Sequence, residues 1–424
     1  MGRDAEDCTA DSIDLWLRSV KVGGMQKTAI PERVAVENSG AARTPVPMLD
    51  LKRQYEPLRG ELMEALGQVL ETQQFILGKN VVAFERAAAE HLGVKHALGC
   101  SSGTDALWLA LAGAGVGPGD AVVTTPFSFF ASVSAILRAG ATPVLADIDP
   151  VTFNLSPAEV EAVLDGKRGA GVKAILPVHL YGLCADATAF SKLGRERGLT
   201  IVEDAAQAWG AEWNGVKAGA LGDAAAFSFY PTKNLSAAGD AGMVTTNRDE
   251  VAERVKMLRN QGMRHRYHHD ELGWNARMDG FQGAVLTVKL KYIGAWNETR
   301  RELAARYGRL FARAGLAENG PYPANGLVLP HEAPGTKHVW HQYVIRVVRR
   351  DAMREFLTAR GIGSEIYYPL PLHLQEALKP LGYGEGDFPE AEQAAREVLA
   401  LPIFPELRED EQNAVAEAIV EFLS

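Results

Sequence analysis

The sequence predicts an α/β protein with a mostly parallel sheet, followed by a smaller second domain. From His96 to Asn247, short apolar segments alternate with helical patterns, and Gly or Pro stands at most junctions. The apolar segments are nearly continuous, which is typical of strands covered by helices on both faces. Seven strands are expected, over His96–Cys100, Ala121–Thr125, Thr142–Asp147, Lys173–Val178, Thr200–Val202, Ala224–Phe229 and Gly242–Thr246.

The second domain is predicted from the pattern that follows the sheet. Val344–Val348 reads as one of its strands, and a pair near Asp240 in the large sheet is expected to be antiparallel. The expected helices cover Asp105–Ala114, Ala185–Arg197, Phe281 to about Arg313, Glu390–Ala400 and Glu409–Phe422. We therefore divide the chain into an N-terminal extension (1–45), a large domain (46–290) and a small C-terminal α+β domain (291–424).

The composition is that of a globular protein with a large core. The chain has 424 residues, of which 47% are apolar and 23% charged. Its net charge of −9 argues against a broad surface for nucleic acid. Any ligand that resembles a nucleotide must therefore be held by local basic groups.

The cysteines and the N-terminus bear on the cellular location. Cys8, Cys100 and Cys184 are scattered without CxxC spacing, so neither a disulfide framework nor a zinc site is indicated, and a cytoplasmic location is expected. No apolar run approaches the ~20 residues needed to span a bilayer. Residues 1–45 lack the pattern of a signal peptide and are expected to be disordered, with one short amphipathic turn at Ile13–Leu17.

Two residues at strand ends carry the main chemical signal. Lys233 follows the strand that Pro231 terminates, at the sheet edge where α/β proteins place their chemistry. A lysine held there out of bulk water has a lowered pKa and reacts with carbonyl groups. Asp204 ends an earlier strand and is the group that would keep a pyridine nitrogen protonated. Together they indicate an enzyme that holds pyridoxal phosphate (PLP) as a Schiff base. The alternative is that Asp204 caps a helix and Lys233 is a solvated turn residue.

These residues stand in two motifs that are specific in combination. Asp204-Ala205-Ala206-Gln207, with Ser228-Phe229-Tyr230-Pro231-Thr232-Lys233-Asn234-Leu235, resembles the nucleotide-sugar aminotransferases of the DegT/DnrJ/EryC1/StrS family. The resemblance runs from about Pro47 to the C-terminus. It implies a PLP-dependent transferase of fold type I with a seven-stranded, mostly parallel sheet. It also assigns Lys233 as the lysine that binds PLP and moves protons, and places Gln207 near the cofactor's O3′.

A phosphate cradle is expected where the first strand meets its helix. The N–H groups at a helix N-terminus bind anions, although Ser102-Gly103-Thr104-Asp105 could be a plain N-cap. The resemblance implies that Gly103, Thr104 and Asp105 bind the PLP phosphate and that Ser228 adds a hydroxyl. Ser102 stands where the family commonly has Asn.

An aromatic residue is expected to stack on the flat PLP ring. Phe129 lies in Pro126-Phe127-Ser128-Phe129-Phe130, just after the second strand. A phenylalanine cluster in this position is core more often than cofactor site. The assignment of Phe129 therefore depends on the resemblance.

The loop Leu272–Asp279 implies a homodimer with shared active sites. In the family this loop crosses the dimer interface, and its Asn binds the partner's PLP phosphate, which is the role implied for Asn275. Arg277 resembles a residue that meets the carboxylate of the amino donor or substrate. The alternative interpretation is a solvated surface loop.

A basic run precedes that loop in this acidic chain. Arg264 and Arg266 are hypothesised to hold the nucleotide diphosphate of a sugar nucleotide. Three nearby histidines (His265, His268 and His269) lack the carboxylate or Cys partners of a metal site, so no metal is predicted.

The last informative stretch begins at Ile366-Tyr367-Tyr368-Pro369 and resembles the subset of the family that acts on 3-keto nucleotide sugars. His373 is a candidate sugar contact or a structural histidine. Tyr181 is a further candidate for substrate binding.

We therefore expect a PLP-dependent aminotransferase that aminates a keto nucleotide sugar at C3 with L-glutamate as donor. The same chemistry at C4 is the alternative, and a non-catalytic PLP-binding regulator is a second. The absence of GxGxxG after the first strand argues against a dinucleotide-dependent oxidoreductase.

Overall fold

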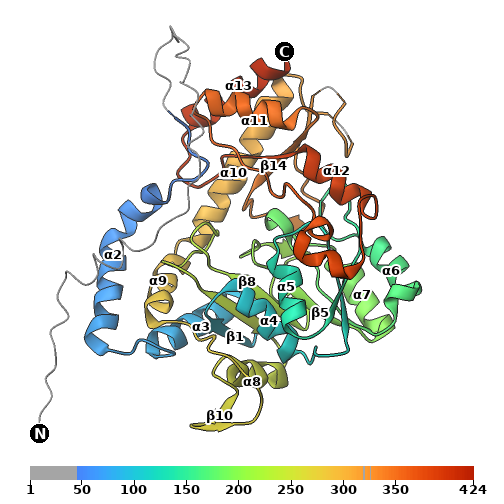
Figure 1. Ribbon diagram of the computed structural model, residues 1–424. Helices are drawn as coiled ribbons and strands as arrows, with labels where there is room; N and C mark the ends of the chain where they lie inside the picture. The colour runs from blue at the N-terminus through green and yellow to red at the C-terminus, as the bar shows by residue number, and fades with distance from the viewer. Residues whose placement is uncertain (1–44, 319, 325) are drawn as a thin grey trace, which may run out of the picture. The chain divides into compact units, whose positions relative to one another are not determined.

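The computed structural model describes residues 45–318, 320–324 and 326–424 (Figure 1). Except for Pro45, the predicted extension 1–45 lies outside the described residues, as does the turn expected at Ile13–Leu17. Among the helices of the described ranges, none is both long and apolar enough to cross a membrane.

The central sheet contains the seven predicted strands. Its order is β1-β9-β8-β5-β4-β2-β3, and β9 runs antiparallel to both of its neighbours while the other pairs are parallel. The strands are β1 (His96–Cys100), β2 (Ala121–Thr124), β3 (Thr142–Leu145), β4 (Val172–Ile175), β5 (Thr200–Asp204), β8 (Ala224–Ser228) and β9 (Gly242–Thr246). The prediction of a mostly parallel sheet, with an antiparallel pair near Asp240, is confirmed.

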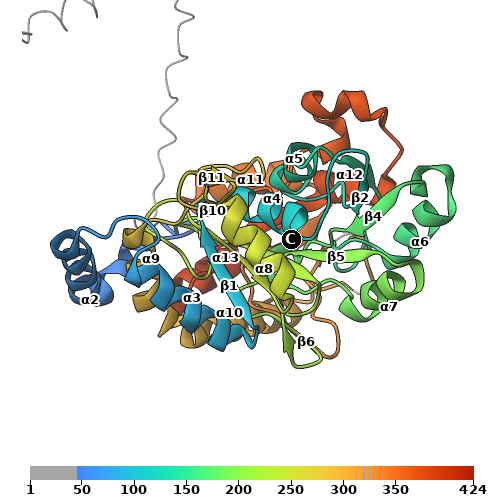
Figure 2. The same cartoon turned by 90° about the horizontal axis from the view of Figure 1, so that it is seen from below.

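Helices cover both faces of this sheet because its strands are apolar on both sides. On β1, Leu98 and Cys100 join the core under one set of helices, while Ala97 joins the core under the other. The first set is α4 (Gly103–Gly113), α5 (Ala131–Arg138) and α8 (Asp249–Leu258). The second set is α3 (Lys79–Leu92), α6 (Pro157–Asp165), α7 (Ala187–Arg197) and α9 (Gly280–Leu290). Figure 2 shows α6 and α7 at one end of the sheet and α2 (Leu51–Thr72) at the other.

A second, antiparallel sheet lies in the C-terminal part of the chain. Its order is β12-β14-β15, and Figure 1 shows α10, α11 and α13 grouped around β14. Tyr307 and Phe311 of α10 are fully buried in this group. The elements are α10 (Ile293–Arg313), β12 (Leu327–Val328), β14 (Tyr343–Val347), α11 (Arg350–Ala359), α12 (Pro389–Glu397), β15 (Val398–Leu401) and α13 (Glu409–Leu423).

Two predicted helices in this region were wrong in extent. The pattern from Phe281 to Arg313 is two helices, broken at Lys291 and Tyr292, whose side chains both hydrogen-bond to Glu61 of α2. The pattern Glu390–Ala400 changes from helix to strand at Val398, because the last residues pair with β14.

The remaining elements are short. One small sheet joins β13 (Thr336–Lys337), β6 (Glu212–Trp213) and β7 (Val216–Lys217). A separate hairpin of β10 (Met263–His265) and β11 (His268–His269) projects beyond α8 in Figure 1. The 3₁₀ helices are η1 (Lys167–Gly169), η2 (Leu180–Gly182), η3 (Leu372–Leu374) and η4 (Glu376–Leu381).

The second sheet packs on the carboxyl-end edge of the first. Phe127 and Val178, which follow β2 and β4, share a buried cluster with Val344 of β14 and Ala400 of β15. The C-terminal part of the chain therefore covers the segments that follow the strands at this edge of the large sheet.

Candidate active site

The carboxyl ends of β5 and β8 bring Asp204 and Lys233 together. Asp204 is the last residue of β5 and is 4% exposed. Lys233 lies in the turn after β8, where its amide donates to Tyr230 O at 2.8 Å. Burial lowers the pKa of Lys233 to about 8, and the charge of Asp204 acts in the opposite direction. Within the described residues the Lys233 amine has no hydrogen-bond partner, so it is available to a ligand.

Both oxygens of the Asp204 carboxylate accept hydrogen bonds. Its Oδ2 accepts from Ser132 Oγ at 2.7 Å, and its Oδ1 accepts from the Ala206 amide at 3.2 Å. Burial raises the pKa of Asp204, and the Ser132 hydroxyl, the Ala206 amide and the Lys233 charge oppose that rise. Ser132 Oγ also lies 2.9 Å from Ser128 Oγ, and both serines are buried.

Gln207 joins the site to the C-terminal part of the chain. Its Oε1 accepts from the Tyr181 amide at 2.6 Å, and its Nε2 donates to Tyr368 Oη at 3.1 Å. The Tyr368 ring lies 6.4 Å from the ring of Phe129, measured between centroids. Phe129 itself is 60% exposed although its neighbour Phe127 is fully buried. An exposed ring beside buried polar groups is suited to stacking on a planar ligand.

The turn before α4 is built tightly against β8. Ser102 caps α4 by accepting from the Asp105 amide at 3.1 Å. A β-carbon on Gly103 would lie 2.5 Å from Ser228 Cβ, so the glycine lets the Ser228 hydroxyl approach the helix N-terminus. The amides of Gly103 and Thr104 have no acceptor within their own helix and can bind an anion.

Asp105 makes its contacts within this turn and with Arg138 of α5. Its carboxylate accepts from Ser101 Oγ and from Ser102 Oγ, and it also pairs with Arg138. The Arg138 guanidinium lies over the Trp108 ring, 4.4 Å from its centroid. Asp105 therefore braces the turn, while Gly103 and Thr104 are the residues whose amides remain for a phosphate.

Asn275 and Arg277 lie in an exposed loop that is tied to the same turn. The Ser101 amide donates to Ala276 O at 3.2 Å, and Asn275 Oδ1 accepts from Arg277 Nε at 3.0 Å. Asn275, Arg277, Ser101 and Asp240 border one cavity of about 330 Å³. The structure thus brings Asn275 beside the turn before α4 of its own chain, where the phosphate is expected to bind.

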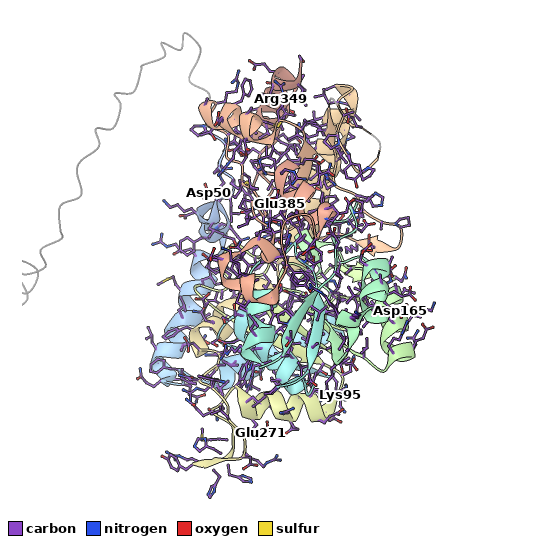
Figure 3. The ribbon with its side chains drawn as sticks, turned by 45° about the vertical axis from the view of Figure 1, so that its right-hand side comes forward. Asp50, Lys95, Asp165, Glu271, Arg349 and Glu385 are labelled. Atoms are coloured by element: carbon purple, nitrogen blue, oxygen red, sulfur yellow. The ribbon has the colours of Figure 1, made fainter. Side chains whose placement is uncertain are left out.

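Arg264 and Arg266 lie in the projecting hairpin. Arg264 Nε pairs with Asp270 at 2.7 Å, and the Arg266 guanidinium lies over the exposed Tyr267 ring, 5.0 Å from its centroid. Figure 3 labels Glu271 beside this hairpin, at the end of the structure away from Arg349. Among the described residues, no hydrogen bond or ion pair joins the two arginines to Lys233 or Asp204.

Two candidate substrate contacts lie in the interior. His373 is 1% exposed, its Nε2 lies 3.0 Å from Glu392 Oε1, and its ring packs edge-on against Phe388. Tyr181 is 4% exposed, and its hydroxyl donates to Tyr367 O. The burial of His373 and its contacts with Glu392 and Phe388 favour the structural alternative. Tyr181 holds Gln207 through its backbone.

The sequence prediction missed three residues of this group, Ser128, Ser132 and Tyr368. The two serines stand four residues apart around Phe129, a spacing that faces them toward each other on a helical turn and could have marked them. Nothing local in the sequence links Tyr368 to Gln207, which is 161 residues away. The described part of the chain holds no cluster of His, Cys, Asp and Glu suited to a metal ion.

Comparison with known families gives one match over most of the chain. A model of the DegT/DnrJ/EryC1/StrS aminotransferase family matches residues 57–420. A pleiotropic regulatory protein of Geobacillus stearothermophilus is 50% identical over 377 residues, 89% of this chain and 98% of the relative. A UDP-N-acetyl-3-dehydro-α-D-glucosamine 3-aminotransferase of Acidithiobacillus ferrooxidans is 42% identical over 376 residues, 89% of this chain and 97% of the relative.

Solved structures agree with these matches. The crystal structure of S. venezuelae DesV in complex with a ketimine intermediate superposes with a TM-score of 0.85 at 43% identity, covering 90% of this chain and 99% of the other. That of NtdA from Bacillus subtilis, with bound cofactor PMP, gives a TM-score of 0.81 at 29% identity and covers 90% of this chain and 86% of the other.

Proposed function

This chain belongs to the DegT/DnrJ/EryC1/StrS aminotransferase family, and from this premise we propose that it aminates a 3-keto nucleotide sugar with L-glutamate as donor. The chain is a PLP-dependent aminotransferase. The observation that carries the function is the pair at the carboxyl ends of β5 and β8, a lysine amine with a pKa of about 8 and a buried carboxylate.

The residues present fit PLP. Lys233 offers an amine with no partner in the described residues, and Phe129 offers an exposed ring. Gly103 leaves room for Ser228 at the N-terminus of α4, where a phosphate would lie. When bound, PLP supplies an electron sink for the charge left on the donor's Cα.

Each residue has a separate task in the transfer. Lys233 would hold the cofactor and, as a free amine, would move the proton between Cα of the donor and C4′ of the cofactor. Asp204 holds a proton on the ring nitrogen through a charge-assisted hydrogen bond, worth about 1.5–3 kcal/mol. Tyr368 and Gln207 close the side of the site that meets the C-terminal part of the chain.

The choice of C3 follows the relatives. The name of the Acidithiobacillus protein specifies a 3-aminotransferase acting on a 3-dehydro nucleotide sugar. Transamination at C4 is the alternative within the same chemistry. Arg264 and Arg266 are proposed to hold the nucleotide diphosphate, and Arg277 the carboxylate of the amino donor or substrate. Asn275 is proposed to bind the phosphate of the partner's PLP in a homodimer.

The name of the Geobacillus relative raises the alternative of a regulator. The Lys233 amine, with a pKa that burial lowers to about 8, and the buried Asp204 carboxylate form a pair suited to proton transfer. This arrangement favours catalysis over a purely regulatory role.

Purified protein should be yellow and should bleach with borohydride, and Lys233→Ala should abolish both properties. Mixing with L-glutamate should convert the bound cofactor in one half-reaction, and a panel of 3-keto and 4-keto nucleotide sugars should reverse it. Reversal by 4-keto sugars alone would overturn the C3 assignment. A protein that takes up no added PLP would overturn the whole proposal.

A further inference from the structure

We propose that Ser132 is a positioning residue for Asp204: its hydroxyl orients the carboxylate and keeps it ionised, so that the ring nitrogen of PLP stays protonated. The inference rests on the proposed function, because it assumes that Asp204 faces that nitrogen.

The direction of the hydrogen bonds follows from the donors available. An ionised carboxylate only accepts, so Ser132 Oγ must donate across the 2.7 Å contact to Asp204 Oδ2. A hydroxyl has one proton, so Ser128 must be the donor in its 2.9 Å contact with Ser132. The result is a one-way chain from Ser128 through Ser132 to Asp204, in which each donor strengthens the next.

Among the described residues, Ser132 is the one side chain that hydrogen-bonds to Asp204. The other titratable groups that act on this carboxylate come from three different segments. Lys233 favours its charged form, as a protonated His179 would, while burial and the charge of Asp204 raise the pKa of Tyr368. The His179 ring is occupied elsewhere, because its Nδ1 accepts from the Ala185 amide and its Nε2 faces Glu203 at 2.9 Å.

The same turn also sets the stacking ring. Phe129 stands between the two serines, and the Ser132 amide donates to Phe129 O at 3.2 Å. The bond between the hydroxyls of Ser128 and Ser132 closes this turn from inside, with both side chains buried. One segment therefore positions the ring that would lie over the cofactor and the carboxylate that would meet its nitrogen.

The test compares Ser132→Ala and Ser132→Cys with wild type. Ser134→Ala is the matched control, since Ser134 lies on the same helix and its hydroxyl bonds only to Ala131 O, at 3.4 Å, among the described residues. Each protein is reconstituted with PLP labelled with ¹⁵N in the ring. The readouts are the ¹⁵N shift against pH, the dissociation constant for PLP, and the rate of the L-glutamate half-reaction.

In Ser132→Ala the ring-nitrogen signal should move toward the neutral position, and the half-reaction should slow by about 10- to 100-fold, as for the loss of a hydrogen bond to a charged group. Ser132→Cys, with a weaker donor, should shift the signal less in the same direction. Ser134→Ala should match wild type in all three readouts.

The outcomes separate the two proposals. A wild type that binds no PLP overturns the proposed function and this inference with it. A wild type with a protonated ring nitrogen, together with an unchanged signal in Ser132→Ala, overturns the inference alone. If Ser132→Ala does not fold, the test uses Ser132→Cys instead. A ring-nitrogen signal in Ser132→Cys equal to that of wild type then overturns the inference.

Discussion

Gly103, the first residue of α4, lies so close to Ser228, the last residue of β8, that a β-carbon on the glycine would be 2.5 Å from the β-carbon of the serine. The neighbouring Gly242 has the same constraint, since a β-carbon there would be 2.2 Å from Ser102 O. Two strands and a helix N-terminus thus meet at van der Waals contact where the phosphate of PLP is proposed to bind.

Gly103→Ala should therefore weaken PLP binding by about 10- to 100-fold, because inserting a methyl group into a filled space costs about 1–3 kcal/mol and here displaces Ser228. The dissociation constant is measured by fluorescence titration of the apoprotein. Gly60→Ala in α2 is the control, since nothing lies within 4 Å of the added β-carbon. It should leave PLP binding unchanged and stabilise the fold by up to about 1 kcal/mol. Equal PLP affinity in both variants would contradict the proposed cradle.

Most of the fold could be predicted from local sequence, and the errors lie where distant contacts decide. All seven central strands are present, but the pattern Lys173–Val178 ends as a strand at Ile175. Leu176 joins the core under α4, α5 and α8, whereas Val178 is covered by β14 and β15. The periodicity of the local sequence does not reveal a cover that comes from so far along the chain. In the same way, Val398–Leu401 is a strand because β14 pairs with it.

The site could be predicted where its residues sit in motifs beside strand ends, as Asp204 and Lys233 do. It could not be predicted where a partner comes from another part of the chain. Tyr368 meets Gln207 only because the C-terminal part of the chain packs on the large sheet. His373 was ambiguous for the same reason: the sequence does not show the Glu392 carboxylate that binds it in the interior.

The pKa of Lys233 predicts the pH dependence of PLP uptake. A neutral amine attacks a carbonyl and an ammonium does not, so the rate of uptake by the apoprotein should rise with pH and reach half its maximum near pH 8. Asp204→Asn removes the charge that raises this pKa, so the midpoint should move to lower pH. Stopped-flow absorbance measures the rate, and the same titration with Nα-acetyllysine corrects for the ionisation of PLP itself. A midpoint near 10.4, the pKa of an ordinary lysine, would contradict the burial of the Lys233 amine.

The hairpin arginines should differ in their effect on substrate binding. Arg264 is already paired with Asp270, whereas Arg266 has no carboxylate partner among the described residues. Arg266→Ala should raise KM for the nucleotide sugar by about 10-fold with a smaller change in kcat, and Arg264→Ala should raise it less. Arg195→Ala provides the control, since this exposed arginine bonds to Ser191 on α7. Steady-state kinetics that do not distinguish Arg266→Ala from Arg195→Ala would rule out the diphosphate role.

A mixed dimer can show whether Asn275 binds the PLP phosphate of its own subunit or that of the partner subunit. The loop Leu272–Asp279 is implied to cross to a partner subunit, but its Asn275 also borders one cavity with Ser101 of its own chain. Asn275 could therefore serve the site of either subunit, and the experiment distinguishes the two. Lys233→Ala and Asn275→Ala are each expected to be inactive as homodimers. If Asn275 acts on the partner's site, a dimer of one Lys233→Ala chain and one Asn275→Ala chain contains one site with both residues intact. Co-expression with two affinity tags isolates this mixed dimer, and its activity should return to about half that of a wild-type dimer carrying the same tags. If Asn275 acts within its own chain, each site of the mixed dimer lacks one residue, and the dimer stays inactive.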